Sequence, residues 1–138
     1  MSRTIALLER EYEETEDVRT EEQFAIANGT LGRLRLASGD SAGSVEAFAS
    51  ALSLLPADDD DTWRIKTLRA HAQFGSGLAH FRLGELESAL VMFESALEEV
   101  PSEMKVVRGH VTVLLAQTLW ALGSDEARET ARGQLLEW

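Results

Sequence analysis

The stretch that decides the fold is GLAHFRLGELESALVMFESALEEVP, residues 77–101. Six of its positions carry the pattern: Gly77, Gly84, Ala89, Phe93, Ala96 and Pro101. Gly77 allows one helix to approach Ala89 of the next, and Gly84 turns the chain between the two helices. The aromatic ring and the second alanine fill the layer below this crossing, and Pro101 ends the second helix. The stretch therefore predicts two helices that are joined by a glycine turn and packed against each other.

The same pattern recurs 45 residues earlier in the chain. The five matching residues are Gly32, Gly39, Phe48, Ala51 and Pro56. Ser44 takes the place of Ala89, which is a conservative change. A weaker copy follows around Gly123, where alanine replaces the first glycine and the alanines of the second helix fit only with a one-residue shift.

This pattern resembles the tetratricopeptide repeat (TPR), a pair of antiparallel helices that recurs about every 34 residues. The resemblance covers residues 20–138 approximately and implies that neighbouring units stack to bury a continuous core. The longer offset leaves about 11 more residues than this repeat needs, and they follow Pro56. We place residues 57–61 in a loop, with Thr62 as the cap of a helix that continues to Leu83.

We predict an all-α, TPR-like helical-hairpin solenoid of about seven helices. An acidic helix is expected in residues 3–17, where apolar residues recur at three and four among glutamates. Further helix starts are expected at Thr20, Ser102 and Ser124. The chain then divides into an N-terminal acidic helix (1–19), repeat 1 (20–56), repeat 2 with an extended first helix (57–101) and a degenerate repeat 3 (102–138).

Composition and charge exclude several kinds of function. The chain has no cysteine, which excludes disulfides, thiolate zinc sites and thiol catalysis and fits a reducing compartment. Its formal net charge of −11 repels phosphate backbones and acidic lipids, so no direct nucleic-acid binding is expected. The sequence has neither a signal-peptide pattern in residues 1–8 nor a run of about 18 apolar residues, so no membrane partner is expected.

The TPR resemblance implies that the first helix of each repeat faces a concave groove. The candidate partner-binding residues lie on these helices and are Arg33, His71, Phe74, Leu78, Phe81, Arg82, His110, Val113, Gln117 and Trp120. The set is largely apolar and aromatic with arginines at its flanks, which suits an amphipathic helix or an extended peptide. The alternative is that Phe74, Leu78 and Trp120 pack against neighbouring helices, as aromatic stripes usually do.

Other kinds of site have less support in the sequence. Chaperone-binding TPR members hold a C-terminal carboxylate with polar side chains, whereas here glycine, phenylalanine and valine occupy most of those positions. His71 and His110 hold equivalent places in adjacent repeats, but two histidines without a third ligand do not predict a metal. The four aspartates of residues 58–61 lack the spacing of a calcium loop and read as solvated charge near a helix start. No catalytic motif is present, so we expect no enzyme activity, no cofactor and no metal.

Residues 114–123, followed by Glu126, Ala127 and Arg128, resemble the C-terminal repeats of the TPR scaffold subunits of superkiller complexes. The resemblance implies a part of a complex that feeds RNA to the cytoplasmic exosome, with contacts to a helicase or a β-propeller subunit rather than to RNA. We therefore expect a cytoplasmic interaction scaffold or adaptor that binds a protein segment in its concave groove, within a larger assembly. The alternative is a regulatory TPR module that senses a ligand or signalling peptide for an attached enzyme.

Overall fold

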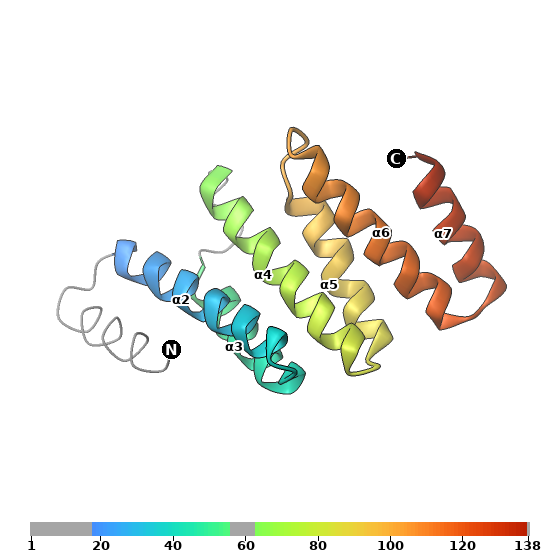
Figure 1. Cartoon of the computed structure of the whole chain (residues 1–138). Coiled ribbons are helices and arrows are strands. Elements are labelled where there is room, and N and C mark those ends of the chain that lie inside the picture. Colours follow the sequence, from blue (N-terminus) through green and yellow to red (C-terminus); the bar gives the residue numbers. More distant parts are fainter. Residues whose placement is uncertain (1–17, 56–62, 138) are drawn as a thin grey trace.

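The computed structural model describes residues 18–55 and 63–137, and over these residues the chain forms six helices and no strand (Figure 1). They are α2 (Val18–Ala37), α3 (Ser41–Leu54), α4 (Trp63–Arg82), α5 (Leu86–Glu99), α6 (Lys105–Leu122) and α7 (Asp125–Glu137). The predicted all-α architecture is confirmed. The acidic helix expected in residues 3–17 and the aspartates of residues 58–61 lie outside the described residues.

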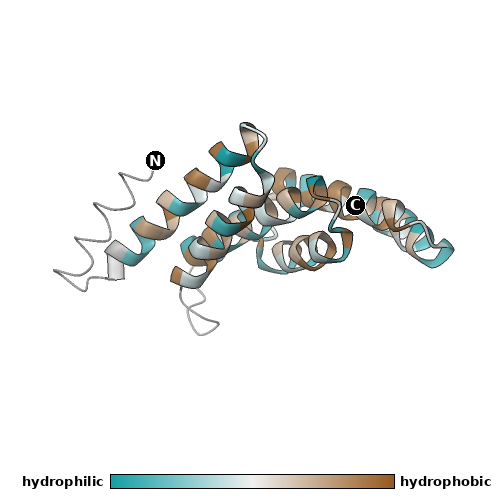
Figure 2. Cartoon of the chain, turned by 90° about the horizontal axis from the view of Figure 1, so that it is seen from below, coloured by the Kyte–Doolittle hydropathy of each residue, from teal (hydrophilic) through white to brown (hydrophobic). Residues whose placement is uncertain are grey.

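The helices pack as consecutive pairs. α2 lies against α3, α4 against α5 and α6 against α7, and the pairs are joined by contacts of α3 with α4 and of α5 with α6. The stack runs in one direction, with α2 at one end and α7 at the other, and apolar and polar residues alternate around its helices (Figure 2). The structure is therefore a TPR-like helical solenoid. In the part of the chain that is described, no helix is both long and apolar enough to cross a bilayer.

Each pair turns at a glycine in the left-handed region of backbone conformation. These are Gly39 (φ 92°), Gly84 (φ 80°) and Gly123 (φ 81°). At the end of α4, Gly84 N–H donates to the Phe81 carbonyl (3.1 Å) and Glu85 N–H donates to the His80 carbonyl (2.9 Å). These two hydrogen bonds satisfy carbonyl groups that the end of the helix would otherwise leave without a partner. The predicted turn role of all three glycines is confirmed.

Phenylalanine rings of the second helices press against glycines of the first helices. A Cβ atom built on Gly77 would lie 2.6 Å from Phe93 Cε1, and its three nearest atoms all belong to that ring. The side chain nearest to Gly77 is thus Phe93, whose ring occupies the space in front of the glycine, rather than the predicted Ala89. Ala89 is nevertheless fully buried in the same core cluster as Phe93.

The equivalent ring in the first pair is wedged between two first helices. Phe48 of α3 lies against Gly32 of α2, where an added Cβ would be 2.9 Å from the ring, and against Gly75 of α4. Ser44, the counterpart of Ala89, is fully buried, and its hydroxyl donates to the Gly32 carbonyl (2.8 Å). The conservative change from alanine to serine thus adds a hydrogen bond at the crossing of α2 and α3.

The predicted helix starts have different outcomes. α2 includes Val18, two residues before the start expected near Thr20, and Thr62 lies outside the described residues. Ser102 does not cap α6, because Met104 N–H first closes a turn onto the Pro101 carbonyl (3.0 Å) and the helix begins after it. The start at Ser124 is confirmed, since its hydroxyl accepts a hydrogen bond from Ala127 N–H (3.0 Å).

The first helices of the pairs are long throughout the chain. α2 and α4 both have 20 residues and α6 has 18, whereas α3 and α5 each have 14. A long first helix is thus not peculiar to the central pair.

Candidate partner-binding site

A groove of about 380 Å³ runs between α2 and α4 and is also lined by α3. Twelve of its fourteen lining residues are apolar or glycine: Ala25, Ile26, Gly29, Leu36, Phe48, Ala51, Leu55, Leu68, Ala72, Phe74, Gly75 and Leu78. The other two are Arg33 and His71. Ile26 is 49% exposed, so the groove presents a large apolar side chain to solvent. Such a surface suits the apolar face of a peptide or helix.

Small residues on the two first helices keep this groove open. A Cβ atom added to Gly29 of α2 would meet no atom within 4 Å, so the backbone there borders open space. Gly75 and Ala72 of α4 bring that helix close to the Phe48 ring, which contributes to the lining from α3. The groove therefore follows from a large residue on the second helix and small residues on the first helices.

The two polar residues of the groove are close enough to influence each other. Partial burial, and secondly the nearby Arg33 guanidinium, lower the pKa of His71 below its ordinary value of 6.5. Arg33 is exposed, and its Nη2 reaches Thr30 Oγ1 of the same helix at only 3.4 Å, a weak hydrogen bond. The guanidinium can therefore turn to a carboxylate of a bound segment.

Four of the ten residues predicted for partner binding come together in this groove, namely Arg33, His71, Phe74 and Leu78. Phe74 also forms a tilted ring pair with Phe93, with centroids 6.2 Å apart. Phe74 and Leu78 both pack against the core cluster formed by α5, α6 and α7. These two residues thus serve the groove and the core at once.

Three of the predicted residues have other surroundings. Phe81, for which only partner binding was predicted, packs against the core cluster and is not among the residues that line the groove. Arg82 is not itself a lining residue, but its Nη1 donates to the carbonyl of the lining residue Leu36 (2.9 Å) and so joins the end of α4 to the end of α2. His110 is exposed on α6, and the described residues hold no group of three or more side chains suited to a metal.

The remaining three predicted residues line a separate hollow of about 270 Å³ between α6 and α7. Its lining residues are Val113, Ala116, Gln117, Trp120, Ala131, Arg132 and Leu135. The Trp120 ring is faced by two guanidinium groups of α7, with Arg128 Cζ at 5.0 Å and Arg132 Cζ at 5.4 Å from its centroid. These three residues thus line a hollow that shares no lining residue with the α2–α4 groove.

Sequence reasoning missed residues in both surfaces. Leu68 carried a usable signal, because it lies three residues before His71 and so on the same side of α4. Arg128 and Arg132 stand four residues apart, a spacing that places them on one face of a helix. Their position against Trp120 depends on how α7 packs on α6, which the weak third repeat did not specify.

Comparison with known proteins identifies relatives of the chain. No protein-family model matches it, and no solved structure matches it. It is 38% identical over 135 residues to Superkiller protein 3 of Schizosaccharomyces pombe, a match that covers 98% of the chain and 9% of that protein. It is 27% identical over 137 residues to Superkiller protein 3 of Saccharomyces cerevisiae, covering 99% of the chain and again 9% of the relative. The resemblance to superkiller scaffold proteins is confirmed: over nearly its whole length the chain is homologous to one segment of Superkiller protein 3.

Proposed function

We propose that the chain is a scaffold segment of a superkiller-type RNA-decay complex and that it holds a protein partner in the α2–α4 groove. Two findings support this function, namely the homology to Superkiller protein 3 and the solenoid of stacked helix pairs. The observation that carries it is the lining of the groove, which is apolar except for Arg33 and His71.

The partner segment has an apolar face and a carboxylate in this proposal. The apolar face fills the groove beside the exposed Ile26, and the carboxylate pairs with Arg33. We place this segment in a helicase or β-propeller subunit of the complex, and we locate the assembly in the cytoplasm. The proposal includes no enzymatic activity, no direct contact with nucleic acid and no membrane partner. In this proposal residues 20–56, 57–101 and 102–138 are three TPR-like repeats. They belong to the C-terminal repeat region of the scaffold.

Two exposed aliphatic side chains of α2 provide a matched test of this proposal. Ile26 and Leu34 are on the same helix and are both 49% exposed, but only Ile26 lines the groove. Ile26→Glu should weaken binding to the purified helicase or β-propeller subunit of the fission-yeast complex at least about tenfold, or about 1.4 kcal/mol. Leu34→Glu should leave the affinity nearly unchanged, because it adds the same charge outside the groove.

This pair separates loss of binding from loss of fold better than a substitution of Phe74 does. Phe74→Glu would also remove the ring pair with Phe93 and place a charge beside the core cluster. Equal affinities for folded Ile26→Glu and Leu34→Glu, measured by calorimetry, would show that the partner does not use the groove.

A further inference from the structure

The α6–α7 hollow corresponds to part of the α2–α4 groove. Gly123 ends α6 as Gly39 ends α2, 84 residues earlier. At this offset, three residues of α2 that line the groove correspond to three residues of α6 that line the hollow. The pairs are Gly29 with Val113, Arg33 with Gln117, and Leu36 with Trp120. α6 therefore lines the hollow with the same positions that α2 uses to line the groove.

The difference lies in the next helix. In the groove, α4 lies beside α2 and α3 and supplies six lining residues. Among the described residues, no helix takes the corresponding place beside α6 and α7, as Figure 1 shows. Apolar side chains are consequently open to solvent there, with Trp120 45% and Leu135 47% exposed. The surface that α4 covers in the groove is therefore open to solvent in the hollow, and its shape suits the apolar face of a helix.

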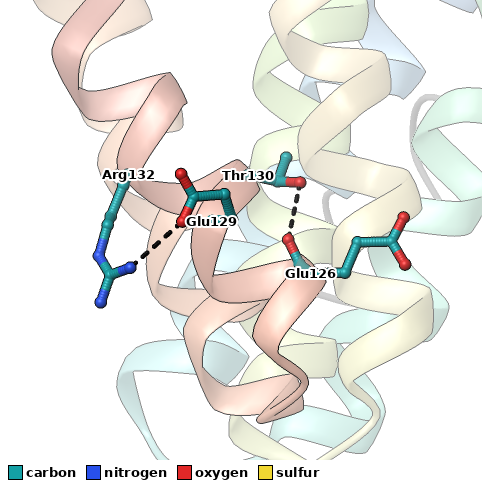
Figure 3. A network of polar contacts seen from close by, with 4 residues as sticks. All are labelled: Glu126, Glu129, Thr130 and Arg132. Carbon is teal, nitrogen blue, oxygen red and sulfur yellow. Dashed lines mark hydrogen bonds and ion pairs between the residues drawn. The ribbon is translucent and has the colours of Figure 1, made fainter.

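The charges around the hollow select the kind of helix. Arg128 and Arg132 share the face of α7 that carries the lining residue Ala131, whereas Glu126 and Thr130 lie on another face, where Thr130 Oγ1 donates to the Glu126 carbonyl at 3.0 Å (Figure 3). Two guanidinium groups thus stand at the hollow of a chain whose formal charge is −11.

These guanidinium groups have hydrogen-bonding capacity to spare. Arg128 Nε is buried and has no hydrogen-bond partner among the residues that the structure describes. Arg132 Nη1 pairs with Glu129 Oε2 at 3.3 Å, but the two side chains are 61% and 78% exposed. Such an exposed pair contributes little and exchanges readily for another carboxylate. Stacking on the Trp120 ring holds both groups in place for a carboxylate.

We infer that the α6–α7 hollow is the docking site of an acidic amphipathic helix from a partner polypeptide. Its apolar residues cover Trp120 and Leu135, and its carboxylates pair with Arg132 and Arg128. An RNA strand also offers stacking and negative charge, but its affinity rests mostly on phosphate contacts, which a chain of charge −11 opposes along the whole strand. A helix with a few carboxylates gains instead from the buried apolar surface.

The test uses two designed helical peptides of about 16 residues, labelled with fluorescein. One has leucines on one face and glutamates beside them, and the other has glutamine in place of each glutamate. The full chain should bind the glutamate peptide at least about tenfold more tightly in fluorescence anisotropy. Arg132→Gln and Arg128→Gln should each remove most of this preference. Arg64→Gln, which removes an exposed guanidinium that lines neither surface, should leave it intact. Arg33→Gln measures how much of the peptide binds in the α2–α4 groove instead.

Each other result contradicts the inference in a distinguishable way. Equal binding of the two peptides, or binding of neither, removes the acidic helix as the occupant. Loss of the preference in Arg33→Gln alone assigns the peptide to the α2–α4 groove and leaves the proposed function in place. Binding of oligouridylate that depends on Arg132 makes the hollow a nucleic-acid site. Self-association that Arg132→Gln abolishes, measured by sedimentation, makes the occupant a second copy. Circular dichroism of each variant shows whether it is folded, and the largely exposed Arg132 makes that variant the safer of the two.

Discussion

Gly77 of α4 and Gly29 of α2 differ in what surrounds them, and this difference predicts opposite effects of alanine. Gly77→Ala would place a methyl group 2.6 Å from the fully buried Phe93 ring, so we expect a loss of about 1–3 kcal/mol in the free energy of unfolding. Gly29→Ala meets no atom within 4 Å and should gain about 0.5–1 kcal/mol, because alanine has the higher helix propensity. Urea denaturation measures both. An unchanged or increased stability of Gly77→Ala would show that Phe93 does not press on Gly77.

His71 predicts a pH dependence of stability. Its pKa is lowered in the folded chain, so the unfolded chain binds more protons between the lowered value and 6.5. Stability is therefore fully present above pH 6.5 and is lost as the pH falls through the lowered pKa. His71→Gln should show a smaller loss of stability than the natural chain between about pH 7.5 and about pH 5 in urea denaturation.

Arg33 provides the control for this effect. Burial is the larger cause of the lowered pKa and Arg33 the smaller. Arg33→Gln should therefore raise the pKa of His71, measured from its imidazole resonances by NMR, without restoring the ordinary value. Complete restoration would mean that burial does not contribute.

At the scale of elements, the glycine turns define the helix pairs. Gly84 has φ 80°, and the bonds from Gly84 and Glu85 N–H end α4. Gly84→Ala should cost about 1–2 kcal/mol, because a Cβ atom disfavours the left-handed region. Gly84→Asn should cost less, since asparagine enters this region more readily. Thermal unfolding compares the two variants; an unchanged midpoint for Gly84→Ala would show that the turn relaxes without cost.

Arginine side chains bond helices to one another, both within a pair and between pairs. Arg82 donates to the Leu36 carbonyl across the α2–α4 contact, and Arg108 donates to the Leu97 carbonyl (3.1 Å) at the end of α5. Arg69 of α4 forms a partly buried ion pair with Glu99 of α5 (3.3 Å). Several arginines are thus engaged in holding helices together, which leaves those beside Trp120 and in the α2–α4 groove for partners.

The whole molecule has a charge that opposes RNA. With a formal net charge of −11, the full chain should bind single-stranded RNA with a dissociation constant no tighter than about 10⁻⁴ M at physiological salt. Fluorescence anisotropy with labelled oligouridylate measures this affinity. Micromolar binding that weakens steeply with added salt would contradict the expectation and would indicate a local basic surface strong enough to overcome the total charge.

The sequence by itself determined the turns and the kind of fold. The positive φ of Gly39, Gly84 and Gly123 is a local requirement that glycine meets best, so their spacing was readable without tertiary information. The repeat of Phe48 at Phe93 likewise predicted stacked pairs, because a large residue at a fixed distance from a turn must enter the same layer. Four residues of the α2–α4 groove, namely Arg33, His71, Phe74 and Leu78, could be predicted from the alignment of the repeats.

Only the tertiary structure decided which residues of the first helices share a surface. The positions of neighbouring first helices depend on rings such as Phe48, which is wedged between α2 and α4, and periodicity within one helix does not contain that information. Packing directs Phe81 into the core, and the Leu36 carbonyl engages Arg82. Trp120 meets its arginines only because α7 folds back on α6. Local spacing fixes the face on which a residue lies, whereas contacts between distant segments fix what that face meets.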